Sequence, residues 1–180
     1  MTVHSGLTPA RFRAVLGHFC TGVAVVTAPG PVGFACQSFA ALSLDPPLVL
    51  FCAGKESRSL PVIRAAGVFA VNVLAGEQQG LSTVFGRSGP DKFAGVDWSP
   101  TESGSPLLAG VLTWVDCVLR TEHEAGDHVI VVGEVRALGP VNDGRPLLFY
   151  RGRYAATDGG GEPSGPLEEL VTWPRPTDWV

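Results

Sequence analysis

The stretch Lys55-Glu-Ser-Arg-Ser59 gathers two cations and two hydroxyl groups within five residues. It stands where we expect a short helix to begin, at about Ser57. The first N–H groups of a helix lack intrahelical partners, and the helix dipole favours negative charge there. The residues therefore predict a phosphate site that uses Lys55, Ser57 and Ser59. A serine that caps the helix among solvated charges is the ordinary alternative, and it accounts for the same pattern.

Histidine is the other residue type that suggests chemistry, and His128 is the candidate. It follows Gly126-Asp127 at the start of an expected strand, and loops at such positions often present functional groups. His4, His18 and His123 are interpreted as ordinary exposed or hydrogen-bonded histidines. No H-x-x-x-H pair occurs, so we predict no metal site.

The familiar sequence motifs of nucleotide-binding and hydrolytic enzymes are missing from the chain. Neither G-x-G-x-x-G nor G-x-x-x-x-G-K-[ST] occurs, and G-x-S-x-G is absent too. A nucleotide would therefore have to bind by another route.

One helix is predicted near the N-terminus. Thr8-Pro9 suits a helix start, because threonine caps and proline fits the first turn. Apolar residues then recur at helical spacing, which predicts a face packed against the core. These residues are Phe12, Val15, Leu16 and Phe19.

Apolar runs separated by turn residues predict that the rest of the chain is mainly strands with short helices. Helices are expected at 57–66, where Gly67 would cap the C-terminus, and at 77–85, followed by a polar loop over 86–105. Strands are expected at 23–27, 32–39, 48–52, 68–74, 111–122, 128–138 and 146–150. Helices and strands do not alternate regularly, which argues against a doubly wound parallel sheet and favours a closed, mostly antiparallel barrel.

Composition limits the classes of function. The net charge of −4 argues against a nucleic-acid surface. No apolar run is long enough to span a membrane and no secretion signal is evident, so we expect a cytoplasmic protein. The four cysteines form no C-x-x-C pair and lie in apolar segments, which predicts reduced thiols that pack as small hydrophobes.

Several linked motifs, in this order, resemble those of the flavin reductase-like family, which has the FMN-binding split β-barrel fold. They are 19–27, 33–39, 42–48, 55–59, 69–73, 91–93, 126–128 and 146–154. The resemblance runs from about residue 8 to 155. It implies a mainly β, antiparallel split barrel of Greek-key type over 1–155, followed by a Gly/Pro linker and tail over 156–180. Within the family, the chain resembles the reductase components of actinobacterial two-component monooxygenases, including those of seco-steroid hydroxylation and of antibiotic and enediyne pathways.

The resemblance also implies which residues form the site. His128 would lie where nicotinamide docks and would orient it. Residues expected beside the flavin ring and ribityl chain are Ala35, Cys36, Gln37, Ser38, Phe39 and Ser43. Those expected around the phosphate are Cys52, Ala53, Lys55, Ser57, Ser59 and Lys92. Those expected to flank the nicotinamide pocket are Tyr150, Arg151, Gly152, Arg153 and Tyr154. Many relatives carry threonine in place of Ala35 and serine in place of Ala41, which removes two side-chain hydrogen bonds that flavin could receive.

The function implied is reduction of FAD or FMN by NADH, with NADPH the weaker donor, and release of the reduced flavin to a partner monooxygenase. A homodimer is also implied. Two alternatives on the same barrel stay open: a non-catalytic flavin-binding protein, and an enzyme similar to pyridoxamine phosphate oxidase that holds FMN permanently. The motifs at 126–128 and 43–47 favour the reductase over both.

Overall fold

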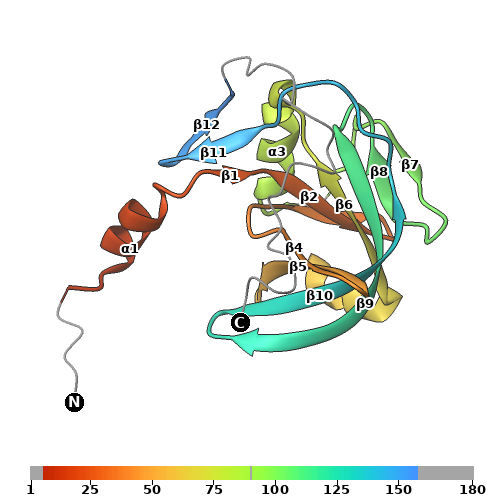
Figure 1. Cartoon of the computed structure of the whole chain (residues 1–180), viewed down its shortest axis with the longest axis horizontal. Helices are drawn as coiled ribbons and strands as arrows, with labels where there is room; N and C mark the ends of the chain where they lie inside the picture. The colour runs from red at the N-terminus through yellow and green to blue at the C-terminus, as the bar shows by residue number, and fades with distance from the viewer. Residues whose placement is uncertain (1–5, 90, 158–180) are drawn as a thin grey trace.

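The computed structural model describes residues 6–89 and 91–157. A strongly curved antiparallel sheet wraps around one side of the molecule, two of the three helices pack against it, and two small sheets accompany it (Figure 1). The seven strands of the main sheet lie in the order β3 (Val32–Cys36), β2 (Ala24–Ala28), β6 (Val68–Val73), β9 (Thr113–Ala125), β10 (His128–Leu138), β5 (Pro47–Gly54) and β4 (Ala40–Leu44). This order confirms the predicted antiparallel barrel.

Aromatic and β-branched side chains fill the inside of the curved sheet. Phe51 of β5 and Phe69 of β6 are fully buried, and their rings meet edge to face at a centroid distance of 5.1 Å. Phe34 of β3 packs against Phe51 at 5.8 Å, so three strands share one aromatic cluster. Gly133 of β10 lies directly over Phe69, where any Cβ would overlap the ring. Packing thus requires a glycine in the middle of this strand.

Two short helices cover parts of the sheet. α2 (Ser59–Ala66) buries Leu60 and Ile63 and ends at Gly67, which has the left-handed conformation expected of a C-cap. α3 (Gln79–Gly86) follows a single 3₁₀ turn, η1 (Gly76–Gln78), and packs mainly on β3. Both helices lie within two residues of their predicted ranges, and each has one end beside the cavities described below.

The N-terminal helix forms as predicted, but its apolar face does not pack against the core. α1 (Pro9–Leu16) begins as expected, with Thr8 accepting a hydrogen bond from the N–H of Arg11 at 3.2 Å. However, α1 stands away from the barrel and buries none of its residues (Figure 1). The predicted packed face is therefore exposed within this chain. Its members include Val15, which is 61% exposed, and Phe19, which is 77% exposed.

Two small sheets were only partly predicted. β1 (Thr21–Gly22), β11 (Leu148–Tyr150) and β12 (Arg153–Ala155) form one, and only β11 falls within a predicted strand. β7 (Trp98–Pro100) and β8 (Pro106–Leu108) form a hairpin, most of it inside the predicted polar loop. Buried Asn72 of β6 holds this hairpin, because its amide donates to the carbonyl of Pro106 at 3.3 Å and accepts from the N–H of Leu108 at 2.9 Å.

Among the predictions for the strands and the cysteines, some are confirmed and others are wrong. The predicted strand at 32–39 ends at Cys36, and the chain then crosses into β4, an edge strand that was not predicted. Cys36 and Cys117 are buried as expected, whereas Cys20 is exposed and Cys52 is half-buried; all four are free thiols. No helix in the described ranges is long and apolar enough to cross a membrane. Residues 158–180, which make up nearly all of the predicted linker and tail over 156–180, lie outside the described residues.

Candidate active site

Two cavities adjoin along β3, and both are of the size that small ligands occupy, roughly 300–1,000 Å³. One, which we call the His128 cavity, has a volume of about 670 Å³. The other, the Lys92 cavity, has a volume of about 770 Å³. The residues that line both are Phe34, Ala35, Gly54, Gly86 and Arg87. The cavities therefore share a wall, and we refer to them together as the two chambers of the candidate site.

His128 is positioned by the tight turn between β9 and β10. Gly126 takes a positive φ of 66°, and the chain then enters β10 with His128 opposite Gly54 of β5. The imidazole Nδ1 lies 2.7 Å from a carboxylate oxygen of Asp127. This hydrogen bond lowers the pKa of Asp127. It also fixes one ring nitrogen, so that Nε2 faces the glycine end of β5, 3.9 Å from where a Cβ of Gly54 would stand.

Ser38 lines the His128 cavity and is hydrogen-bonded to β5. Its hydroxyl accepts a hydrogen bond from the N–H of Cys52 at 2.9 Å and lies 3.2 Å from the carbonyl of the same residue. Cys36 lies 3.3 Å from this hydroxyl, and burial raises the pKa of its thiol. Because the Ser38 side chain is engaged within the protein, its contribution to a ligand falls mainly on its backbone groups.

The wall formed by α3 and the β11–β12 hairpin was not foreseen in full. Ser82 of α3 is buried, and its hydroxyl lies 3.0 Å from the phenol oxygen of Tyr154. Tyr154 in turn meets Phe149 edge to face at 5.4 Å. Sequence reasoning named Tyr154 but missed Ser82, Thr83, Gly86 and Arg87, all of which line the His128 cavity. Their position at the end of the predicted helix 77–85 was the one available indication.

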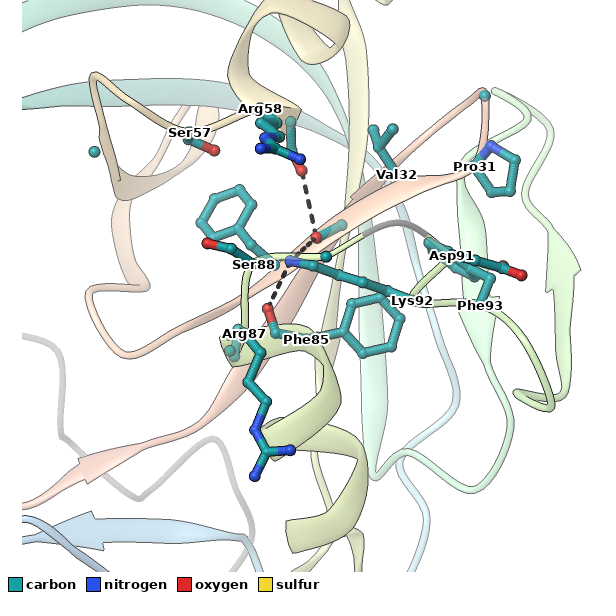
Figure 2. Close-up of a pocket in the computed structure, with 18 of the residues that line it drawn as sticks. Pro31, Val32, Ser57, Arg58, Phe85, Arg87, Ser88, Asp91, Lys92 and Phe93 are labelled. Atoms are coloured by element: carbon teal, nitrogen blue, oxygen red, sulfur yellow. Dashed lines mark hydrogen bonds between the residues drawn. The ribbon is translucent and has the colours of Figure 1, made fainter.

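Lys92 reaches into its cavity from the loop after α3 (Figure 2). Its ammonium donates to the carbonyl of Gly33 at 3.1 Å and to that of Phe85 at 3.0 Å. An ammonium group has three N–H donors, so one is left for a ligand. Burial lowers the pKa of Lys92. Among the described residues no carboxylate lies within salt-bridge distance of it.

The start of α2 forms another side of the Lys92 cavity. Ser57, Arg58 and Ser59 all line it. Neither serine caps the helix: α2 begins at Ser59, its N-cap is Arg58, and that residue makes no capping side-chain bond. The buried hydroxyl of Ser59 instead donates to the carbonyl of Gly33 at 3.3 Å. The capping alternative is thus not observed, and the start of α2 lies at the edge of the cavity.

Lys55 has a different setting. Its backbone N–H donates to the carbonyl of Asp127 at 3.0 Å, and its ammonium pairs with Glu124. Lys55 therefore ties the end of β5 to the β9–β10 turn and lines neither cavity in this chain. Its expected contact with phosphate stays a prediction.

The predicted site residues divide into those that line one of the two cavities and those that line neither. The His128 cavity collects Ala35, Cys36, Gln37, Ser38, Cys52, His128 and Tyr154, and the Lys92 cavity collects Ala35, Ser57, Ser59 and Lys92. Residues that line neither are Phe39, Ser43, Ala53, Lys55, Tyr150, Arg151, Gly152 and Arg153. Arg151 and Gly152 form the tip of the β11–β12 hairpin, where the N–H of Arg151 donates to the carbonyl of Gly17 just after α1.

Comparison with known proteins decides the family, because the flavin reductase like domain matches residues 16–158. The chain belongs to this family. Over 181 residues it is 49% identical to HsaB, the reductase subunit of a flavin-dependent monooxygenase from Rhodococcus jostii, with 97% of this chain and 93% of the relative covered.

Two solved structures are similar throughout. Nitrilotriacetate monooxygenase component B from Mycobacterium thermoresistibile has a TM-score of 0.83 and 50% identity, covering 91% of this chain and 95% of the other. The NADH:FAD oxidoreductase SgcE6 from Streptomyces globisporus, solved with NAD and FAD fragments, has a TM-score of 0.82 and 37% identity, covering 85% and 94%. The predicted family and fold are confirmed.

The residues present fit a flavin. Gly54 and Gly86 line both chambers, and a Cβ at either would have a single neighbouring side-chain atom within 4 Å, at 3.9 Å. Small residues thus leave room for a flat ring, while hydroxyls and cations lie in the next chamber. A metal site is a different matter: within residues 6–89 and 91–157, no three His, Cys, Asp or Glu side chains gather to form one.

Proposed function

We propose that this protein is an NADH-dependent flavin reductase that releases reduced FAD or FMN to the oxygenase component of a two-component monooxygenase. Family membership and the reductase relatives support this. The observation that carries the proposal is the two-chambered site, in which a histidine faces one chamber and a lysine the other. The reduced flavin would leave by diffusion, so no permanent complex with the oxygenase is required.

The flavin and the nicotinamide together supply the chemistry when bound, which is transfer of a hydride. The chain's own residues bind, orient and exclude water. Ala35 and the segment that follows it border the His128 cavity, and Ser82 and Tyr154 border it as well. His128 would orient the nicotinamide through Nε2, while Asp127 holds its other nitrogen. Lys92 and the start of α2 would hold phosphate.

Steady-state kinetics test the proposal. Purified protein with excess FAD or FMN and NADH should oxidise NADH catalytically. Added cytochrome c, a soluble acceptor, should be reduced only when free flavin is present. A protein that stays yellow through purification and turns over no added flavin would support one of the two alternatives, a flavin store or an oxidase similar to pyridoxamine phosphate oxidase.

For the nicotinamide, we infer a preference for NADH over NADPH. A 2′-phosphate normally calls for an arginine nearby, and a cluster of cations would favour it most. Arg87 is the single arginine or lysine among the described residues that line the His128 cavity, whereas Arg151 and Arg153, expected near the nicotinamide, lie on the β11–β12 hairpin outside it. Equal kcat/KM values for NADH and NADPH would contradict this preference.

We further propose that residues 1–155 form one catalytic domain and that 156–180 are an appended linker and tail. The family match to residues 16–158 and the last strand, β12, support the boundary. Free thiols at all four cysteines and the use of NADH support a cytoplasmic location.

A homodimer is proposed from α1. A helix that exposes all its apolar residues away from its own barrel leaves an apolar surface uncovered, and such surfaces mark interfaces (Figure 1). Strand β4 adds a second uncovered feature, because it pairs only with β5 and exposes Leu42 and Leu44. We propose that α1 of one copy packs on the other.

The oligomeric state can be tested by sedimentation. The native protein should sediment at about twice the 18.8 kDa of one chain. Val15→Glu should shift it toward monomer because a charge would be buried at the interface. Val141→Glu is the matched control, since Val141 is equally apolar and 80% exposed in a loop. A native monomer at micromolar concentration would contradict the proposal.

A further inference from the structure

Two of the four cysteines line the His128 cavity, although the proposed function gives neither thiol a task. Cys36 is the last residue of β3, and Cys52 stands near the end of β5. These two strands are not hydrogen-bonded neighbours in the main sheet, yet they contact each other in the fold. The curvature of the sheet therefore brings two thiols that are distant in the sequence to one cavity.

The side chain of Ser38 lies between the two cysteines. Its hydroxyl oxygen is 3.3 Å from the sulfur of Cys36 and 2.9 Å from the backbone nitrogen of Cys52. The two distances together place the Cys36 sulfur within about 6.2 Å of that nitrogen. A disulfide joins residues whose Cα atoms lie roughly 4.4–6.8 Å apart, so two residues that meet at the same hydroxyl are close to bonding range.

The electrostatics of Cys36 show the same proximity. Burial is the main reason that the pKa of its thiol is raised, and hydrogen bonds to Ser38 oppose this effect. Cys52 acts on the same thiol in two ways, because a charge on its sulfur raises the pKa of Cys36 and its backbone N–H lowers it. Both the sulfur and the backbone of Cys52 therefore lie near the Cys36 thiol.

The two thiols differ in their access to solvent. Cys52 is half-buried, whereas Cys36 is only 5% exposed. Oxidants in solution react first with accessible cysteines, through the thiolate form. Cys52 is therefore the thiol that meets an oxidant entering the cavity, and Cys36 is placed to react with the oxidised sulfur.

We propose that Cys52 is a site of oxidation by hydrogen peroxide and that Cys36 resolves the oxidised form to a disulfide. The Cys52 thiolate attacks the peroxide, its sulfur becomes a sulfenic acid, and the hydroxide that leaves takes up the thiol proton as water. The sulfur of Cys36 then displaces the sulfenic hydroxyl group, which leaves as a second water with the Cys36 proton. Two thiols are oxidised to one disulfide, and one peroxide is reduced to two waters.

The proposed function supplies the oxidant. Reduced flavin that no oxygenase consumes passes two electrons and two protons to dioxygen, which becomes hydrogen peroxide. The Cys36–Cys52 disulfide then draws β3 toward β5 at the segment expected beside the flavin ring, and flavin affinity falls. The protein thereby slows its own output when the partner is idle. Transient regulatory disulfides of this kind are the ones found in the cytosol.

Mass spectrometry after peroxide treatment tests the site without NADH or flavin. Cys20→Ser is the starting protein, because it lacks the exposed thiol. After treatment it should have lost two hydrogen atoms and should yield one disulfide-linked pair of peptides, containing Cys36 and Cys52. Dithiothreitol should reverse the change. Oxidation of Cys52 without the linked pair, or a pair that contains Cys117, would overturn the proposal.

Variants made in the Cys20→Ser protein separate the two roles. Cys36→Ser should stop at a sulfenic acid on Cys52, which dimedone traps. Peroxide should raise the Kd for FMN at least about tenfold in the starting protein and several-fold less in Cys52→Ala, each compared with its own untreated form. Cys117→Ala is the matched control, since Cys117 is also a buried thiol but lines neither cavity, and it should still form the disulfide. An equal rise in Kd with and without Cys52 would contradict the proposal.

Turnover tests the link to function, which rests on the proposed reductase activity. Protein with NADH, limiting FMN and air should accumulate the disulfide, and catalase should prevent this. The proposal and the function fail separately. A disulfide formed by added peroxide in a protein that oxidises no NADH defeats only the function, and rapid NADH oxidation by a protein that forms no disulfide with added peroxide defeats only the proposal.

Discussion

The imidazole of His128 lies over Gly54, and the two residues are directly paired across β10 and β5. A Cβ added to Gly54 would stand 3.9 Å from Nε2, an ordinary contact, and would meet no other atom within 4 Å. The glycine is therefore dispensable for packing but not for the space in front of the histidine.

Gly54→Ala should consequently weaken ligand binding without harming the fold. We expect the Kd for flavin to rise several-fold and Tm to stay within a few degrees, because the added methyl group takes up room in both chambers. Fluorescence titration and thermal melting give the two numbers. Gly80→Ala is the control: it lies in α3 with open space around it, so binding should not change and stability should rise by about 0.5–1 kcal/mol. Native-like flavin affinity in Gly54→Ala would contradict the placement.

His128 should affect NADH more than flavin. We expect His128→Ala to raise KM for NADH several-fold and to leave the flavin Kd close to that of the native protein, since the ring orients nicotinamide. Asp127→Asn should produce a smaller change in the same direction, because the ring loses the carboxylate that holds Nδ1. A fall in kcat beyond about a thousandfold in His128→Ala would instead indicate general acid catalysis.

Lys92 should make flavin binding depend on pH. Burial lowers its pKa in the free protein, and a bound phosphate raises it again. Between these two pKa values, binding takes up a proton, so affinity falls as pH rises through that window. Calorimetry in two buffers with different ionisation enthalpies measures the uptake. Lys92→Met should abolish it, and undiminished uptake in that variant would assign the proton to another group.

Lys55 tests the phosphate prediction that came from the sequence alone. If the ammonium leaves Glu124 for a bound phosphate, Lys55→Ala should raise KM for flavin much more than it lowers kcat. Glu124→Gln then separates the two partners: it frees the lysine and should leave flavin affinity the same or better. Unaltered flavin affinity in Lys55→Ala would restrict Lys55 to its structural role at the β9–β10 turn.

The cysteines should differ in reactivity. Burial raises the pKa of Cys117 to about 12, so almost no thiolate exists at neutral pH, and burial also raises the pKa of Cys36. Cys52 is half-buried and lines the His128 cavity, so its modification by a thiol reagent should slow when FMN is added. Mass spectrometry of a Cys20→Ser variant, which lacks the exposed thiol, follows this directly. Equal rates with and without FMN would move the flavin away from Cys52.

Much of the fold could be predicted because its strands are apolar runs bounded by turn residues. The strand β4 escaped because it is an edge strand with nearly all its side chains exposed, so no buried face marks it in the sequence. The sequence correctly predicted that α1 is a helix with an apolar face, but the prediction that this face packs against the barrel was wrong. Periodicity shows that a helix has an apolar face, but not whether the barrel of the same chain packs against that face.

The site was predictable where motifs are contiguous, as at 35–38 and 57–59. Ser82 and Tyr154 are 72 residues apart and meet only because α3 packs beside the β11–β12 hairpin. Neither spacing nor residue type could have paired them. Lys92 was placed near phosphate by resemblance, but its two carbonyl partners depend on how the loop after α3 folds back onto β3.

Hydrogen bonds from Asn72 hold the β7–β8 hairpin, which lies between α3 and β9 in the chain, against β6. Besides its bonds to β8, its amide donates to the hydroxyl of Thr27 at 3.2 Å, and Thr27 donates to the carbonyl of Pro106 at 2.6 Å. Hydrogen bonds are directional, so they fix the register of the β7–β8 hairpin, in addition to the packing of Leu108 in the core. Anyone redesigning residues 106–108 would therefore have to keep the carbonyl of Pro106 and the N–H of Leu108 in place, whereas the usual requirement in a barrel is to conserve a volume.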